Sequence, residues 1–488
     1  MSKSITEKKV VNRWKFPCPL CDIVTGFRNS IRRHVARKHP GVDIGPGERG
    51  YRTAGGVKNL SVDGETEENF KVYGCAICLG QFWYRYQLKH HYEYDHGLVA
   101  ANVAEVDCLL REHNIQFALF EDSQKWKLKS GRNVEDILHD FALAASNEHS
   151  AHSFIINPVD STWLQLDVFS KDELDEISTL RYNHLPALPR DLMEYINEFN
   201  LTDQQQIRET LWKQRPFDAS YDQKESFDKD WARNVIHSIL MEIECRQLSQ
   251  DHLESWYISH IWSTLDRCFG DLDEVYVIRG ESASIASGIR KNENRIAAST
   301  TSMKRQMMGH RADLLIRKLK VEYACGETGK SYNSENDTKL LLERQLKMPK
   351  MMKDQLIQLF KLCDNDESAV RKLSIAGILH FGLHQTMLLM DCPAGYVCRV
   401  LPTPTCKVPT TLNTFPSLLN VIKLTWKAKA LIRQVIKDVE RYNSSNDGDS
   451  TEIDVITSRY RTPPLSHGCK DKLYIPSCVT SPTKKQKM

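Results

Sequence analysis

The chain has 488 residues, of which 41% are hydrophobic and 26% are charged, and its net charge is +3. These proportions are ordinary for a globular protein and exclude a collagen-like, wholly disordered or polytopic membrane protein. The charge is unevenly placed, because residues 1–40 carry ten Lys and Arg against two acids, which leaves −5 (3 − 8) for the rest of the chain.

The sequence predicts neither export nor a membrane partner. The N-terminal residues lack the apolar core of a signal peptide, and no run of about 18 apolar residues indicates a membrane span. Fourteen cysteines without a secretory signal indicate an intracellular, reducing environment with thiols that bind metal or stay free.

Two cysteine–histidine sets stand near the N-terminus. In each, two residues separate the cysteines, twelve residues lead to a histidine and four more lead to a second histidine. Two thiolates and two imidazoles form the tetrahedral ligand set that Zn²⁺ prefers, and the metal supplies folding free energy to a short segment without a core. The sequence therefore predicts two Zn²⁺ sites. Their ligands are Cys18, Cys21, His34 and His39, and Cys75, Cys78, His91 and His96.

Both segments resemble the two-Cys/two-His zinc finger family, a two-stranded hairpin followed by a helix. The resemblance implies zinc finger 1 in residues 1–42, a linker in 43–70 and zinc finger 2 in 71–98. Finger 1 departs from the family because Thr25 stands where an aromatic residue is expected, which predicts an irregular hairpin.

The resemblance also implies contact with nucleic acid, because family fingers present helix positions to bases in the major groove. Arg33 in finger 1 suits guanine and Gln87 in finger 2 suits adenine, whereas neighbouring basic side chains suit phosphates. Finger 2 is nearly neutral and rich in aromatic residues, which favours unpaired bases or a protein partner. Spacers or protein-docking modules are the alternative interpretation. The candidate nucleic-acid-binding residues are Arg28, Ser30, Arg32, Arg33, Arg37, Lys38, Arg85, Gln87 and Lys89.

Residues 99–270 are expected to be mainly α-helical, because apolar residues recur at intervals of three and four. No cluster there has the spacing of a metal site or a nucleophile, so its aromatic residues are interpreted as core. The expected helices are Val103–Phe117, Val134–Leu143, Leu192–Phe199, Phe227–Leu248 and Trp256–Phe269.

Residues 271–442 change to an α/β pattern, and the polar residues 443–488 are expected to form a disordered tail with a basic end that suits nuclear import or simple solvation. The whole chain is thus predicted to be a multidomain α+β protein. The expected elements are strands at Val275–Ile278, Ala312–Ile316, Lys320–Cys325 (ending in residues 326–330), Ile378–His384, Thr386–Asp391 and Tyr396–Leu401, and helices at Glu281–Arg295, Lys350–Cys363 and Leu418–Tyr442.

This order of helix, strands, helix, strands and helix, with an Asp and a later Glu and Lys, resembles the PD-(D/E)xK nuclease superfamily, which has a restriction-endonuclease-like fold. The resemblance implies that Asp313 and Glu327 hold Mg²⁺, that Lys330 positions the attacking water and that Glu281 assists. In the family one residue separates the acid from the lysine. Two separate them here, so Lys330 points to the other face of the strand unless Gly329 forms a bulge.

Residues 250–440 also resemble a group of uncharacterised proteins from mucoralean fungi, a resemblance that implies no activity. It is carried by residues 290–292, 309–315, 326–327 and 347–350.

Simpler interpretations stay open. In these interpretations, Asp313 pairs with Arg311 or caps the turn before its strand, and Glu327 pairs with a nearby Arg or Lys side chain. The glycines at 326 and 329 then mark only a tight turn. Cysteines 392, 398 and 406 fit no common zinc spacing and are interpreted as core. The leading hypothesis is a nuclear, zinc-dependent protein that binds DNA or RNA, and the alternatives are a Mg²⁺-dependent nuclease or a protein-interaction scaffold.

Overall fold

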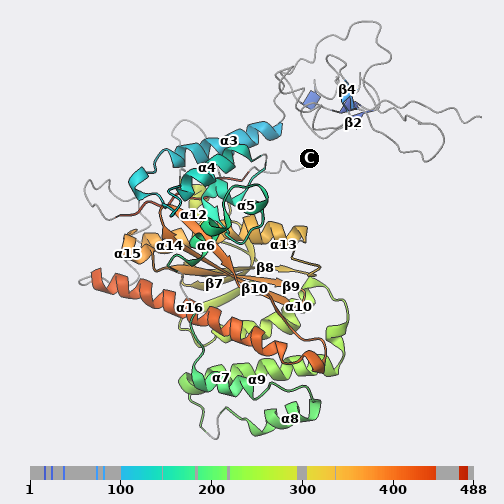
Figure 1. Ribbon diagram of the computed structural model, residues 1–488. Coiled ribbons are helices and arrows are strands. Elements are labelled where there is room, and N and C mark those ends of the chain that lie inside the picture. The colour runs from blue at the N-terminus through green and yellow to red at the C-terminus, as the bar shows by residue number, and fades with distance from the viewer. Residues whose placement is uncertain are drawn as a thin grey trace, which may run out of the picture. The chain divides into compact units, whose positions relative to one another are not determined.

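The computed structural model describes residues 16–17, 24–25, 37–38, 73–74, 81–82, 101–145, 147–181, 185–216, 220–293, 305–335, 337–446 and 472–481. The chain divides into two compact units, one of residues 1–111 with 482–488 and one of residues 112–481. Figure 1 shows the helices and strands of both units.

The first unit contains two short antiparallel hairpins. β1 (Phe16–Pro17) pairs with β2 (Val24–Thr25), and β3 (Tyr73–Gly74) pairs with β4 (Gln81–Phe82). Each hairpin encloses one of the two expected cysteine pairs. Thr25 pairs with Phe16 in the first hairpin, and Phe82 pairs with Tyr73 at the equivalent position of the second. The described strand residues of the first hairpin therefore pair regularly in spite of the threonine.

The second unit is an α+β fold, as expected, built around a mixed sheet that has eight strands within the described residues. The sheet order is β5-β11-β10-β9-β8-β7-β6, with β12 paired to β10. β8 runs parallel to β9 and β5 runs parallel to β11, whereas the other neighbours are antiparallel. The strands are β5 (Ile155–Ile156), β6 (Val275–Ala283), β7 (Arg311–Lys318), β8 (Val321–Gly329), β9 (Ser374–Phe381), β10 (His384–Ala394), β11 (Val397–Pro402) and β12 (Cys406–Lys407).

Helices cover both faces of this sheet (Figure 1). Before β6 the chain forms α3 (Ala101–Phe117), η1 (Asp122–Gln124), α4 (Val134–Ala144), η2 (Ser150–Ser153), α5 (Thr162–Gln165), α6 (Lys171–Thr179), α7 (Arg190–Asn197), α8 (Gln204–Lys213), α9 (Gln223–Glu244), η3 (Gln247–Ser249), α10 (Glu254–Tyr257), η4 (Ile258–Trp262), α11 (Ser263–Asp266) and η5 (Arg267–Phe269). After β6 it forms α12 (Ile285–Asn292), α13 (Thr338–Leu342), η6 (Glu343–Lys347), α14 (Met348–Leu362), α15 (Glu367–Val370), η7 (Leu412–Thr414) and α16 (Ser417–Asn446).

The crossover from β8 to β9 places α14 against the sheet. Parallel neighbours need such a crossover, and here it contains α13, the π-helical turn η6 and α14. Gly377 in β9 permits the close contact, because a Cβ atom at this position would lie 2.6 Å from Met348 Cε and from Met352 Sδ. α12 packs beside α14 on this face, and α16 packs on the opposite face.

The helical region and the α/β region share this unit, although the sequence suggests a boundary near residue 270. Ile155 and Ile156 form the edge strand β5, which pairs with Cys398 and Arg399 of β11. Two residues are too few to show the alternation that identifies a strand from sequence, so this link appears only in the folded chain.

Three local expectations are wrong. Glu281 lies in β6 and not in a helix, since α12 begins at Ile285. The alternative of a tight turn at Gly326 and Gly329 is wrong, because pairing with β9 extends β8 to Gly329. In the expected disordered tail, residues 472–481 are anchored by buried apolar side chains. These are Leu473, Ile475, Cys478 and Val479.

Candidate carboxylate site

The structure brings Asp313 and Glu327 together. β7 and β8 pair Leu314 with Gly326, so the antiparallel register sets Asp313 beside Glu327 on one face of the sheet. The two side chains share a hydrogen bond. Asp313 Oδ2 also accepts a hydrogen bond of 2.8 Å from the backbone N–H of Thr328, which holds this carboxylate in place.

Lys330 and Glu281 lie elsewhere. Lys330 is exposed, and its Nζ donates to Asp251 Oδ2 at 3.1 Å. Gly329 pairs in regular register with Phe381, so no bulge turns Lys330 toward the acids. Glu281 is also exposed and accepts a hydrogen bond from Arg311 at 3.1 Å. Arg311 therefore pairs with Glu281 and not with Asp313.

The turn η6 adds two charged residues that the sequence analysis missed. Glu343 is only 3% exposed, and one of its oxygens pairs with Lys347 Nζ. Its Oε2 is buried and has no hydrogen-bond partner among the described residues. A glutamate four residues before a lysine at the start of a long helix is a weak sequence signal for such a pair, and it does not indicate what the pair faces.

The local environment raises the pKa of Glu327 from 4.5 to about 9. Burial is the largest cause, followed by repulsion from Glu343 and Asp313, and the hydrogen bond with Asp313 acts in the same direction. Lys347 opposes the rise in the pKa but does not cancel it. At neutral pH and without a cation, Glu327 is therefore protonated and donates to Asp313.

The opposite face of the sheet supports the end of β8. Arg279 on β6 donates to Asp266 at 2.8 and 2.9 Å and to Thr328 Oγ1 at 3.3 Å. His380 on β9 stacks on Trp262, with 3.9 Å between the ring centroids. Thr328 is thus held by its side chain on one face, while its N–H positions Asp313.

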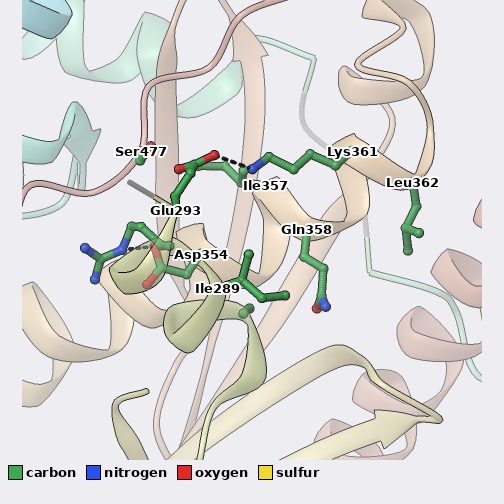
Figure 2. A pocket seen from close by; sticks show the side chains of 10 residues that line it. Ile289, Glu293, Asp354, Ile357, Gln358, Lys361, Leu362 and Ser477 are labelled. Carbon is green, nitrogen blue, oxygen red and sulfur yellow. Dashed lines mark hydrogen bonds and ion pairs between the residues drawn. The ribbon is translucent and has the colours of Figure 1, made fainter. Parts of the chain in front are cut away.

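α12 is held against α14 on the face that carries the acids. Figure 2 shows Glu293, just after α12, paired with Lys361 of α14. This pair measures 3.0 Å, and Arg290 of α12 pairs with Asp354 of α14 at 2.7 Å. The cavity between the two helices has a volume of about 40 Å³. It has room for a few water molecules but not for a substrate.

Within the described residues, neither the surroundings of Asp313 and Glu327 nor any other place gathers enough ligands for a metal site of three or more His, Cys, Asp and Glu side chains. Cys392 and Cys398 are buried free thiols and Cys406 is partly buried. The eight expected Zn²⁺ ligands lie outside the described residues, as do the expected nucleic-acid contacts other than Arg37 and Lys38, which are helical and exposed.

Comparisons with known proteins give no guide to function. No protein-family model, curated protein or solved structure matches this chain. Within the described residues, no helix is both long enough and apolar enough to cross a membrane. The function is therefore inferred from the arrangement of the chain's own residues.

Proposed function

We propose that residues 112–481 carry a divalent-cation-dependent phosphodiesterase site of the nuclease type, with Asp313 and Glu327 as the cation ligands. The observation that carries this proposal is the hydrogen-bonded pair of acids on adjacent strands, with Glu343 close enough to raise the pKa of Glu327. Two partly buried acids beside a buried third one cannot all be ionised at such short range unless a proton or a cation neutralises them. Nucleic acid is the proposed substrate.

The donors fit a hard cation such as Mg²⁺. Carboxylate oxygens are its preferred protein ligands, and Mg²⁺ commonly takes one or two carboxylates and completes its octahedron with water. The Asp313–Glu327 pair meets that need without a third converging acid. A cation that replaces the shared proton lets Glu327 ionise, and the unpartnered Oε2 of Glu343 is a candidate acceptor for a water ligand.

The chain's own residues have distinct tasks in this site. Asp313 is oriented by the Thr328 N–H, Glu327 releases its proton when the site fills, and Glu343 holds Lys347. Lys347 takes the role that the resemblance gives to Lys330, a cation that offsets negative charge and orients the attacking water. The bound metal would polarise a phosphoryl oxygen and lower the pKa of the water.

The topology supports a restriction-endonuclease-like fold. In chain order α12, the pair β7 and β8, α14, the strands β9 to β11 and α16 follow the series helix, strands, helix, strands and helix. Asp313 lies on the first of these strands and Glu327 on the second. The superfamily resemblance rests on that series and on those two acids, so the fold and the site argue for the same proposal.

The test is cleavage of labelled DNA and RNA by the full chain in Mg²⁺ or Mn²⁺. We expect cutting that Asp313→Asn and Glu327→Gln both abolish, while the exposed-acid control Glu281→Gln cuts like the wild type. Cleavage that survives Asp313→Asn, or that is absent from the wild type with every cation and substrate, would overturn the proposal.

We also propose that residues 1–42 and 71–98 are zinc fingers that bring the chain to nucleic acid in the nucleus. A hairpin around each cysteine pair and the exposed helical Arg37 and Lys38 support this proposal. Metal analysis of the full chain should find two zinc ions per chain. The double variant Cys75→Ser, Cys78→Ser should hold only one. Affinity for nucleic acid that does not change with salt would argue instead for a protein-binding role.

A further inference from the structure

The C-terminal segment 472–481 is docked against the second unit by its backbone as well as by its apolar side chains. Leu473 N donates to Asn365 O at 2.8 Å, and Ser477 O accepts from Gln116 Nε2 at 3.0 Å. Ser477 also lines the cavity between α12 and α14 (Figure 2). These contacts hold the segment at its start and in its middle.

Further hydrogen bonds hold the end of the segment. Val479 N donates to Ser153 Oγ at 3.2 Å, and Thr480 N donates to Glu112 Oε2 at 2.6 Å. Val479 is buried, whereas Thr480 is exposed and Ser481 is half-buried. The last described residues therefore reach the surface while their backbone stays bound.

The Ser481 hydroxyl lies between a buried cation and a carboxylate. Its Oγ accepts from Lys350 Nζ at 2.8 Å and donates to Glu148 Oε1 at 2.9 Å. Lys350 is only 3% exposed, and its Nζ also pairs with Glu148 and donates to Val479 O at 2.7 Å. An ammonium group has three N–H donors, so these three contacts use all of them.

The sequence around Ser481 is typical of a kinase substrate. Proline-directed kinases act on a Ser or Thr that is directly followed by Pro, and a basic residue three places further on adds a favourable charge contact. The chain has three Ser-Pro or Thr-Pro pairs, at 403, 462 and 481, and only the last has a basic residue, Lys484, at that distance. The threonine at 403 is also bound to β10 by its N–H and its hydroxyl.

We propose that Ser481 is a phosphorylation site for a proline-directed serine/threonine kinase, and that the phosphate releases the end of the docked segment. A bond forms between Ser481 Oγ and the γ-phosphorus of ATP, while the bond from that phosphorus to the β–γ bridging oxygen breaks and ADP leaves. The hydroxyl proton passes to the catalytic aspartate of the kinase.

The contacts of Ser481 explain the release. The phosphate adds a charge of about −1.5 to −2 at neutral pH, and the modified Oγ no longer donates to Glu148. Glu148 and Glu112, which hold Ser481 and the Thr480 N–H, both repel the new charge. Lys350 has no N–H left for a phosphate oxygen unless it gives up Glu148 or Val479 O. The docked end therefore loses contacts whichever way Lys350 turns.

The first measurement is phosphorylation of the full chain by a proline-directed kinase that prefers a basic residue three places after the serine, with Mg²⁺ and ATP. Mass spectrometry locates the phosphate. We expect modification at Ser481 that Thr480→Ala leaves unchanged and Ser481→Ala removes. A chain that takes no phosphate at Ser481 would overturn the proposal.

The second measurement is hydrogen–deuterium exchange of the full chain before and after phosphorylation. We expect the Val479 and Thr480 amides to exchange at least about tenfold faster with the phosphate, because the loss of one charge-assisted hydrogen bond changes the opening equilibrium by at least this factor. The Leu473 amide, bound to Asn365 O, is the internal control and should stay protected. Unchanged protection at Val479 and Thr480 would overturn the release.

Glu148→Gln tests the physical cause. The amide carries no charge, so Lys350 can pair with the phosphate, and the phosphorylated variant should keep the protection of the segment's end. The matched control Glu281→Gln changes an exposed acid on β6 and should show the same faster exchange as the wild type. Equal release in Glu148→Gln would contradict the repulsion between the phosphate and this carboxylate.

Melting temperatures show whether each variant is folded. Both measurements are read at the C-terminal segment without nucleic acid and without cleavage. Their outcome is therefore separate from that of the nuclease proposal and from that of the zinc fingers.

Discussion

Asp313 and Glu327 meet across the β7–β8 pair and share a hydrogen bond beside the buried Glu343. The pair has two states. Without a cation it keeps a proton, because burial and two neighbouring acids disfavour a second or third negative charge. In the proposed function, a bound cation would take the place of this proton, with both acids as its ligands.

The stability of the metal-free protein should depend on pH through Glu327. The pKa is raised from 4.5 to about 9 in the folded state, so between these values the folded chain holds a proton that the unfolded chain has lost. The free energy of unfolding therefore falls as pH rises through this window, by on the order of 2 kcal/mol between pH 5 and pH 7.

Glu327→Gln removes this dependence, because the amide stays neutral in both states. Thermal unfolding of both proteins from pH 5 to pH 9 in a chelating buffer measures the effect. Equal pH dependence in the wild type and the variant would show that Glu327 is ionised in the folded protein.

Mg²⁺ or Mn²⁺ should stabilise the folded chain more at pH 8 than at pH 6, since the cation competes with the proton on Glu327. At a cation concentration of 100 times the dissociation constant the gain is about 2.7 kcal/mol. Scanning calorimetry with and without the cation measures it. Asp313→Asn should lose the gain, whereas an undiminished gain in that variant would place the cation at another site.

Lys347 and Lys330 should differ sharply in their effect on cleavage. Lys347→Met removes the cation that lowers the pKa of Glu327, so we expect a loss of about 10²-fold in rate and a pH–rate profile displaced to higher pH. Lys330→Met breaks only an exposed pair with Asp251 and should leave the rate unchanged. A larger loss in Lys330→Met would restore the role that the superfamily resemblance suggests.

The buried pair of Arg399 and Asp391 should be important for stability. Arg399 is fully buried, donates to Asp391 at 3.0 and 2.6 Å and donates to the carbonyl of Ile177 at the end of α6 at 2.6 Å. Arg399→Met leaves the Asp391 carboxylate buried without its partner and should cost about 3–5 kcal/mol. Urea unfolding measures the loss, and adding Asp391→Leu to the variant should recover part of it. A double variant that is no more stable than the single one would contradict this account of the loss.

Much of the local structure can be predicted from the chain alone. The apolar runs near Leu314 and Leu388 lie in β7 and β10, and the periodic segments near Val235 and Leu424 lie in α9 and α16. These signals are local, since a strand or helix that buries one face repeats its apolar residues at a fixed interval. The edge strand at Ile155 has no such signal, because its two residues are too few to show an alternation.

The site was predictable only in part. A resemblance to a known superfamily indicates Asp313 and Glu327, and the two-residue gap before Lys330 correctly suggests that this lysine points away from them. Nothing in the spacing identifies Glu343 and Lys347 as their neighbours. That contact depends on the π-helical turn η6 and on the length of the crossover to α14.

The sequence by itself determined the α+β class and most of the strands and helices, because these follow from the spacing of apolar residues. Only the tertiary structure decided which lysine affects the acids. The reason is physical: a pKa and an ion pair depend on distances between side chains, and the register of β8 and the path of the crossover set those distances.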